Sequence, residues 1–371
     1  MPETTRGKLD WINISFLTLT PIIATVGTIL WTIHRGFEWW MLALFLVLYS
    51  LVGMSICAGY HRCFSHRSYS TARPVQAFYA FFGAMAAQNS ILWWCSSHRT
   101  HHSHVDQDWD PYNITRGFWW AHIFWIFFKN PNSGNFDNSP DLVANPIVQW
   151  QHKYYVPILI FGGFGIPTLI GAMFGNPIAG LLWGGFLRVA AVHHSTFFVN
   201  SLAHKLGKPR YAWDVSARDN WAVALLTFGE GYHSFHHRFA SDYRNGVKWW
   251  QWDPAKWLIR GLSKLNLAWD LRSTPAPLIE RARMNAALRA HEHHEEGLSA
   301  SVLQGYRERI ANATAELEES FELWKAAMNE RAAGVSMQWR EKRRQAVRRI
   351  RSARREWVSA IRMIQSAPEV L

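Results

Sequence analysis

The stretch HRTHH, from His98 to His102, determines how this chain must fold, and three related clusters occur elsewhere. They are HRCFSH (His61 to His66), NSLAH, which ends at His204, and HSFHH (His233 to His237). The clusters contain half of the 18 histidines, namely His61, His66, His98, His101, His102, His204, His233, His236 and His237. In both H-x-x-H-H segments, offsets of three and four residues place the rings on one face of a helix. Three or four imidazoles fill the protein-supplied positions of one metal ion, so nine predict a two-metal site.

The ligand type and the neighbouring apolar segments indicate which metals bind. Zinc is an alternative, but histidine-only ligation of two metals beside apolar helices favours redox-active iron and O2 chemistry. The cysteines Cys57, Cys63 and Cys95 form no C-x-x-C pair and indicate a reducing compartment. We expect two iron ions and no haem, flavin or iron–sulfur centre, so electrons must come from a separate protein.

Four long apolar runs predict helices that cross a membrane. The first two, 14–33 and 39–57, contain no charged residue, and each is close to the ~20 residues that a spanning helix requires. The other two, 156–174 and 177–199, are separated by only two residues, which predicts an antiparallel hairpin. Buried helices of a soluble protein are the alternative, but four such runs are difficult to enclose.

The distribution of basic residues predicts the orientation in the membrane. Arg6 and Lys8 precede the first run and basic residues follow the second and fourth, whereas the loop after the first run has one basic residue, Arg35. By the positive-inside rule, both termini and all four histidine clusters face the cytoplasm. The first run has no small-residue cleavage pattern behind it, so we expect no cleavable signal peptide. These features predict a multi-pass protein of a bacterial inner membrane.

The remaining sequence divides into a membrane domain and a charged extension. Thr71 to Trp94 is predicted to form one helix at the membrane interface or in a cap. We expect the membrane domain to cover residues 1–271, because the break STPAP (Ser273 to Pro277) follows it. Residues 272–371 are rich in Ala, Glu, Arg and Leu and predict long, exposed helices.

The extension contains two charged motifs. Residues 340–355 are strongly basic, and three interpretations stay open: an anchor for anionic lipids, a dock for an acidic electron carrier, or a solvated helix without a role in turnover. The stretch HEHHEE, from His291 to Glu296, is interpreted as a solvated charged patch.

The four clusters, in this order and spacing, resemble the membrane fatty acid desaturases, most closely the Δ9 acyl-CoA (stearoyl-CoA type) branch in a bacterial-like form. HRCFSH matches the first histidine box of that family, HRTHH the second and GEGYHSFHH the third. FVNSLAH (Phe198 to His204) matches the additional ligand segment of this branch, and DWDPYN (Asp108 to Asn113) resembles its D-x-D-P-x-N stretch. The similarity covers roughly residues 10 to 271.

The resemblance implies an all-α integral membrane protein, with four membrane helices under a cytoplasmic helical cap. The cap would hold a di-iron centre on the nine histidines. Asn200 would reach the second metal through a water molecule. Asp108, Asp110 and Glu230 would accept ring N–H groups and so orient the ligands.

The resemblance also implies a set of substrate contacts near the headgroup, namely Gln88, Asn89, Trp93, Arg99 and Lys129. In animal members a basic–acidic pair precedes the second box and helps to hold CoA, but Ser96 and Ser97 occupy those positions here. The mode of CoA binding is therefore open, and a membrane lipid is the alternative acyl carrier.

Several residues of the apolar runs have expected roles of their own. Phe45 and Tyr49 are four apart on one helix face and are predicted to close an acyl tunnel, the alternative being that they face lipid or another helix. His193 and His194 lie in the fourth run with Arg188 and are predicted to be structural. We expect the other histidines of this domain to be interfacial or at the surface, namely His104, His122 and His152.

The expected reaction inserts a cis double bond, at Δ9, into a saturated fatty acyl chain while O2 is reduced to water. A methylene C–H is too weakly acidic for side-chain acid–base chemistry, so the metals must supply the oxidant and the protein the orientation. Two electrons would come from a ferredoxin, rubredoxin, cytochrome b5 or reductase. Acyl-lipid desaturation, acyl hydroxylation and membrane metal transport are the alternatives. We expect membrane lipids, and no nucleic acid, among the partners.

Overall fold

The computed structural model describes residues 7–129, 134–292, 300–333 and 338–365, which are mostly helical. By its internal contacts the chain divides into two compact units, 1–273 and 274–371. The first unit contains the long apolar helices and all nine clustered histidines.

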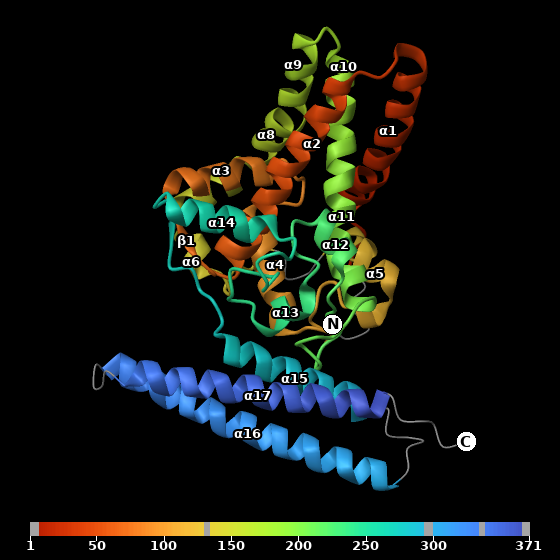
Figure 1. Ribbon diagram of the computed structural model, residues 1–371. Coiled ribbons are helices and arrows are strands. Elements are labelled where there is room, and N and C mark those ends of the chain that lie inside the picture. Colours follow the sequence, from red (N-terminus) through yellow and green to blue (C-terminus); the bar gives the residue numbers. More distant parts are fainter. Residues whose placement is uncertain (1–6, 130–133, 293–299, 334–337, 366–371) are drawn as a thin grey trace. The chain divides into compact units, whose positions relative to one another are not determined.

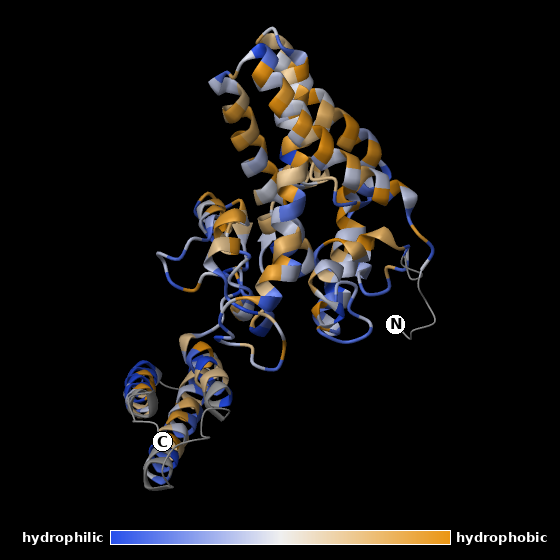
Figure 2. Ribbon diagram, turned by 90° about the vertical axis from the view of Figure 1, so that its right-hand side faces the viewer, coloured by the Kyte–Doolittle hydropathy of each residue, from blue (hydrophilic) through white to orange (hydrophobic). Residues whose placement is uncertain are grey.

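Long apolar helices form one side of the first unit (Figures 1 and 2). They are α1 (Trp11–Arg35), α2 (Trp39–Met54), α8 (Tyr155–Ile160), α9 (Ile166–Met173), α10 (Pro177–Gly180) and α11 (Arg188–Lys205), with π-helical turns η1 (Ser55–Ser65), η4 (Phe161–Gly165) and η5 (Leu181–Leu187) continuing α2, α8 and α10. Among the described residues, three helices are long and apolar enough to cross a membrane: Trp11–Arg35, Trp39–Ser65 and Tyr155–Met173. The fourth predicted span is also helical, but Arg188, His193 and His194 make it less apolar.

The α9–α10 hairpin depends on glycine. Gly175 connects the two helices with a φ of 76°, a conformation that favours glycine. The helices also approach closely, because a Cβ on Gly171 would lie 2.7 Å from the Cα of Gly180. This contact holds the two apolar segments antiparallel.

The prediction of one helix from Thr71 to Trp94 is wrong. The segment forms two helices, α3 (Arg73–Ala84) and α4 (Ile91–Ser103). Between them Ala87 and Asn89 have positive φ values of 56° and 76°, which end helical geometry. Ser90 then caps α4 by accepting the backbone N–H of Trp93 at 3.4 Å.

Side chains of α11 hold this break in place. The guanidinium of Arg188, fully buried, donates to the carbonyl oxygen of Met85 and to that of Gly163, the latter at 2.7 Å. His193 Nε2 lies 2.9 Å from the carbonyl oxygen of Ala86. These contacts satisfy backbone groups that the break leaves without helical partners, and they agree with a structural role for His193.

Shorter elements complete the first unit. They are η2 (Ile114–Arg116), α5 (Phe118–His122), η3 (Phe124–Phe127), α6 (Pro140–Val143), α7 (Pro146–Lys153), α12 (Trp221–Leu226), α13 (His233–Arg238) and α14 (Pro254–Lys264), with β1 (Ser70–Thr71) antiparallel to β2 (Ala268–Trp269). Val52, Tyr60, Tyr79, Ile91 and Ile259 belong to one buried core that joins α2, η1, α3, α4 and α14.

The second unit consists of α15 (Ala276–Glu292), α16 (Ala300–Ala333) and α17 (Trp339–Gln365). Met284, Leu317, Ile350 and Trp357 share its buried core. Ion pairs also join α16 to α17; Arg349, for example, lies 2.8 Å from Glu319. The HEHHEE stretch lies outside the described residues from His293 onward.

Candidate metal centre

The nine clustered histidines converge on the part of the first unit that contains α4 and α13 (Figure 1). Their ring nitrogens form two groups, and within each group the atoms lie within 4.8 Å of one another. The first group contains His61, His66, His98, His102 and His236. The second group contains His101, His204, His233 and His237. All four segments therefore contribute, and each group is large enough to hold a metal ion.

A π-helix brings the two histidines of the first cluster together. In η1 the backbone N–H of His66 donates to the carbonyl oxygen of His61 at 3.0 Å, five residues earlier. This wider turn places residues i and i+5 above one another, and the two rings lie 4.8 Å apart. In an α-helix, with 3.6 residues per turn, residues five apart point in different directions. The π-helix therefore brings the rings of His61 and His66 onto the same side.

The helices α4 and α13 each supply rings to both groups. Two rings of α4 belong to the first group, and two rings of α13 belong to the second. In α4, His98 and His102 belong to the first group and His101 to the second. In α13, His236 belongs to the first group, whereas His233 and His237 belong to the second. The three rings of each H-x-x-H-H segment therefore share one helix face but are divided between two sites.

The ring nitrogens approach one another closely enough to share a cation. Nε2 of His61 lies 3.0 Å from Nε2 of His236, and Nε2 of His66 lies 2.8 Å from that of His98. In the second group, His204 and His233 place their Nε2 atoms 3.0 Å apart. Where Nδ1 carries the ring proton, such contacts bring lone pairs together in a buried space, so the donor set fits a metal pair.

Burial also favours the neutral form of the rings, which is the form that binds a metal ion. Burial, reinforced by the neighbouring rings, lowers the pKa of His98, His101 and His237 well below the ordinary value. For His204 the same two causes lower the pKa to about 3. These four rings are therefore neutral near pH 7 and available to a metal.

Two buried carboxylates contact Nδ1 atoms of ligand histidines. Glu230 Oε2 lies 2.7 Å from Nδ1 of His61, and Asp110 Oδ1 lies 2.8 Å from Nδ1 of His101. Each contact fixes the ring orientation and leaves Nε2 for the metal. Burial raises the pKa of Asp110 to about 7, although backbone N–H groups of Asp106 and Tyr112 lower it.

Two further Nδ1 contacts were not foreseen from the sequence. The Tyr112 hydroxyl lies 3.1 Å from Nδ1 of His98. The Ser216 hydroxyl lies 2.7 Å from Nδ1 of His204 and donates to Asp106 Oδ1 at 2.6 Å. Two carboxylates between residues 106 and 110 take part in these contacts. Asp110 contacts His101 directly, and Asp106 contacts His204 through the Ser216 hydroxyl. Asp108, which lies between them, is exposed. Tyr112 and Asp110 lie in the DWDPYN stretch, whereas Ser216 is not part of any of the motifs found in the sequence.

A buried ion network supports Glu230. Arg62, 1% exposed, donates to Glu230 Oε1 from Nε at 3.1 Å and lies 2.9 Å from Asp253. Asn245 donates to the other oxygen of Glu230 at 2.6 Å. Burial raises the pKa of Glu230, but the charge of Arg62 and the contact with His61 outweigh it and bring the pKa to about 2. The carboxylate is therefore ionised when it contacts His61.

Asp219 fixes the start of α13. Its Oδ1 accepts the backbone N–H of Ser234 at 3.0 Å and that of Phe235 at 3.4 Å. These donors lie in the first turn of the helix and have no partner within it. Asp219 thereby holds the short helix that supplies three ligand histidines.

The predicted ligand Asn200 lies one turn before His204 on α11 and is half-buried. Among the described residues, its side chain has no hydrogen-bonding partner. It is therefore available for the water-mediated contact predicted for it.

Gln88, a predicted headgroup contact, joins two helices. Its Nε2 donates to the Thr196 hydroxyl of α11 at 2.9 Å, and its Oε1 accepts from Trp94 Nε1 at 3.2 Å. Trp94 in turn stacks on the ring of His98, with centroids 4.9 Å apart. Gln88 and Thr196 thus fix an indole against a candidate metal ligand, a role that the local sequence does not reveal.

Arg99, also a predicted headgroup contact, bonds to several parts of the protein. Its Nε donates to the carbonyl oxygen of Ser65 at 3.0 Å, and both terminal nitrogens contact the Asp141 carboxylate at 2.6 and 2.8 Å. The same nitrogens donate to the carbonyl oxygens of Asn138 and Phe64. All five N–H groups are therefore engaged within the protein.

The other predicted headgroup contacts are spread over the surface of the first unit. Asn89 is exposed in the break before α4, and Trp93, partly buried, packs its ring edge-on against Phe136 at 5.7 Å. Lys129 is exposed, and its backbone N–H donates to the carbonyl oxygen of Lys8.

Phe45 and Tyr49 stack on one another on α2, with centroids 5.7 Å apart. The Tyr49 hydroxyl lies 2.7 Å from the Ser195 hydroxyl of α11 and donates to the carbonyl oxygen of Leu226 at 2.6 Å. Tyr49 therefore joins α2, α11 and α12 rather than facing lipid alone.

The expectation that His122 lies at the surface or interface is wrong. His122 is buried, with Nδ1 2.9 Å from the Ser201 hydroxyl and Nε2 3.1 Å from Nδ1 of His194. The α5 helix that carries it packs against α11, which excludes solvent. His104 and His152 are partly exposed, and each contacts a nearby polar group.

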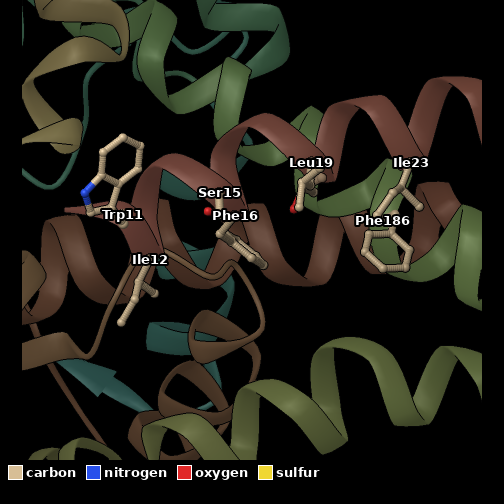
Figure 3. Close-up of a pocket in the computed structure, with 8 residues that line it drawn as sticks. Trp11, Ile12, Ser15, Phe16, Leu19, Ile23 and Phe186 are labelled. Carbon is tan, nitrogen blue, oxygen red and sulfur yellow. The ribbon is translucent and has the colours of Figure 1, made fainter. Parts of the chain in front are cut away.

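An open apolar groove of about 600 Å³ runs along α1, away from the histidines. Trp11, Ile12, Phe16 and Leu19 line it from α1, and Phe186 closes one end (Figure 3). Its apolar lining is typical of a helix surface that contacts acyl chains.

Comparison with known proteins identifies relatives of the chain. The fatty acid desaturase family model matches residues 37–271. Acyl-CoA desaturase 1 of Saccharomyces cerevisiae is 39% identical over 276 residues, which cover 74% of this chain and 54% of that protein. An sn-2 palmitoyl-lipid 9-desaturase of Nostoc is 35% identical over 274 residues, which cover 72% of this chain and 92% of that protein. An sn-1 stearoyl-lipid 9-desaturase of Anabaena variabilis is 33% identical over 271 residues, which cover 72% of this chain and 96% of that protein. The chain thus spans little more than half of the yeast relative.

Proposed function

The chain belongs to the fatty acid desaturase family, and on that premise we propose that it is an O2-dependent fatty acyl desaturase. It would insert a cis double bond at Δ9 of a saturated acyl chain and reduce O2 to water. Two electrons would come from a separate donor protein. Relatives named as acyl-CoA and acyl-lipid desaturases support this reaction class.

One observation carries the proposal: nine histidines in two groups, six of them buried and three partly buried, direct Nε2 atoms at one another. Two iron ions held there would supply the reductive activation of O2. The protein holds the rings through Glu230, Asp110, Tyr112 and Ser216, and Asn200 would position a water beside the second group. Trp94 bounds the first group and would help to place the acyl chain.

We further propose that four helices cross the membrane beneath a cytoplasmic cap. Three of them are apolar enough by composition, and the α9–α10 hairpin makes 177–205 antiparallel to the third. Arg188 and His193 do not prevent a crossing, because both are buried and bonded to backbone carbonyls. The basic residues that flank the histidine clusters favour cytoplasmic termini. The proposed location is a bacterial inner membrane. Residues 1–271 would form this domain and 272–371 a charged extension.

Acyl-CoA is the proposed carrier, and two observations favour an acyl-lipid as second candidate. All the N–H groups of Arg99 bond to the protein. Ser96, in place of one member of the basic–acidic pair, lies 2.8 Å from Asn138 Oδ1. Neither residue then offers a charge to CoA phosphates.

The reaction is tested by expressing the chain in a desaturase-deficient bacterium and locating double bonds in its fatty acids by mass spectrometry. Desaturation removes two hydrogens, and hydroxylation adds one oxygen. We expect cis-Δ9 products from the parent and from His104→Ala, and none from His233→Ala. Hydroxylated products, or normal turnover in His233→Ala, would refute the assignment. Separate assays with acyl-CoA and acyl-lipid identify the carrier.

A further inference from the structure

An exposed face of the first unit combines four tryptophans with three cations. This tryptophan face comprises Lys248, Trp249, Trp250, Trp252, Trp257, Arg260 and Lys264. Trp249 is 85% exposed and Trp250 59%, and large aromatic rings are seldom left so open to water. Trp257, Arg260 and Lys264 share one side of α14 by their spacing of three and four residues.

The loop 246–253, which presents Trp249, Trp250 and Trp252, is held in place by hydrogen bonds from its own residues and from Lys256. The buried Lys256 ammonium donates to the carbonyl oxygens of Gly246, Lys248 and Gln251, at 2.7, 2.6 and 3.0 Å. Asp253 accepts the backbone N–H groups of Asn245 and Gly246, both at 2.9 Å. The exposure of the rings is therefore a property of a fixed structure rather than of a fraying loop.

The base of this loop lies where the helix Trp39–Ser65 enters the histidine region. Asp253 lies 2.9 Å from Arg62, the residue after His61. A Cβ on Gly229 would lie 2.6 Å from Asp253 Oδ1, which places Gly229 against the same point. The loop is thus attached to the end of a candidate membrane span that carries a candidate metal ligand.

The segment before Gly229 continues along the same span toward its apolar middle. The Cys57 thiol lies 3.3 Å from the carbonyl oxygen of Thr227, and Tyr49 bonds to that of Leu226. On the outer side of this segment, Leu225 is 52% exposed and Leu226 46%. Exposed leucines therefore lie beside the span at the level of Tyr49.

Tryptophan with lysine and arginine is the composition that prefers the boundary between headgroups and acyl chains. We propose that the tryptophan face is embedded in the headgroup layer of the cytoplasmic leaflet, where its cations bind anionic lipid phosphates. The cap would then contact the bilayer through this face as well as through the helices that cross it. The inference rests on the proposed crossing of Trp39–Ser65 and not on the reaction catalysed.

The test places a fluorophore at single positions of the full chain in lipid nanodiscs. Trp249→Cys, Trp250→Cys and Lys248→Cys are labelled with an environment-sensitive dye, and the three native cysteines are buried. Ser241→Cys is the matched control, because it is exposed in the same segment but follows α13, which lies farther from the apolar helices (Figure 1). Quenching by doxyl-labelled phosphatidylcholine reports lipid contact, and quenching by iodide reports water.

We expect doxyl-lipid to quench the labels at 249 and 250 several-fold more than the label at 241, and iodide to show the reverse order. Replacing part of the phosphatidylcholine with phosphatidylglycerol should increase the lipid quenching. Metal content equal to that of the parent verifies the fold, and product analysis is a separate assay. Equal iodide quenching at 241, 249 and 250 would overturn the proposal. Protection that requires an added donor protein would also overturn it and assign the face to a protein partner.

Discussion

Glu230 links a candidate metal ligand to a buried cation: its Oε2 lies 2.7 Å from Nδ1 of His61, and its Oε1 accepts from Arg62 at 3.1 Å. The cation keeps the carboxylate ionised, and the carboxylate keeps the ring proton on Nδ1. The lone pair of Nε2 is then directed toward the centre of the first group.

Glu230→Gln is expected to weaken metal binding by about 10–100-fold, because the amide is a poorer acceptor and leaves Arg62 with one anionic partner, Asp253, instead of two. Metal content measured by mass spectrometry after dialysis against graded chelator checks this. The control is Asp137→Asn, which changes an exposed carboxylate and should bind metal as the parent does. Unchanged affinity in Glu230→Gln would mean that His61 does not depend on this contact.

The two groups predict separable losses of metal. His66 belongs to the first group and His204 to the second, so His66→Ala and His204→Ala should each lower the content from two metals per chain toward about one. His104→Ala, outside both groups, should retain both metals. Complete metal loss in both single variants would show that the groups do not bind independently.

Asp219→Asn is predicted to change how stability depends on pH. Burial raises the folded-state pKa of Asp219 from 3.8 to about 6, partly offset by the N–H groups of Phe235 and Ser234. Its stabilising contribution is therefore full below pH ~4 and is lost as pH rises through about 6, by an amount on the order of 3 kcal/mol. The amide still accepts from Ser234 but does not titrate. Melting temperatures between pH 4.5 and 7.5 should fall less with rising pH in the variant, and parallel curves would contradict the prediction.

Tyr49 is predicted to limit the length of the acyl chain. Tyr49→Ala removes a ring between α2 and α11, and the freed space should shift products toward longer chains. Tyr49→Phe keeps the ring and loses only the hydrogen bonds to Ser195 and Leu226, each worth about 1 kcal/mol, so its chain-length profile should stay that of the parent. An unchanged profile in both Tyr49→Ala and Phe45→Ala would place the end of the tunnel elsewhere.

Truncation after Ser273 is expected to leave a folded, metal-binding protein, because the first unit contains all nine histidines and its own core. Truncation after Leu267 is the contrasting variant, since it removes the pairing of β2 with Ser70 and Thr71. Size-exclusion profiles and metal content of both variants provide the test. Loss of metal in the longer variant would make the second unit part of the metal-binding fold.

Local spacing predicted much of this arrangement, and long-range contacts account for the rest. The H-x-x-H-H pattern and the apolar runs are visible in single segments, so the nine histidines and three of the helices followed from them. The break at Met85–Ser90 did not, because Arg188 and His193, about 100 residues away, hold it. Ser216 was missed for the same reason: its contact with Asp106 crosses 110 residues.

The histidine pattern alone also could not divide the ligands between two groups, since rings on one helix face look equivalent in sequence. That division has a mechanical consequence. Because α4 and α13 each contribute rings to both groups, the spacing between the two groups is set by the geometry of an α-helix. Two metal ions bound there would be held by rings on rigid helices, so their positions would depend on the protein fold itself.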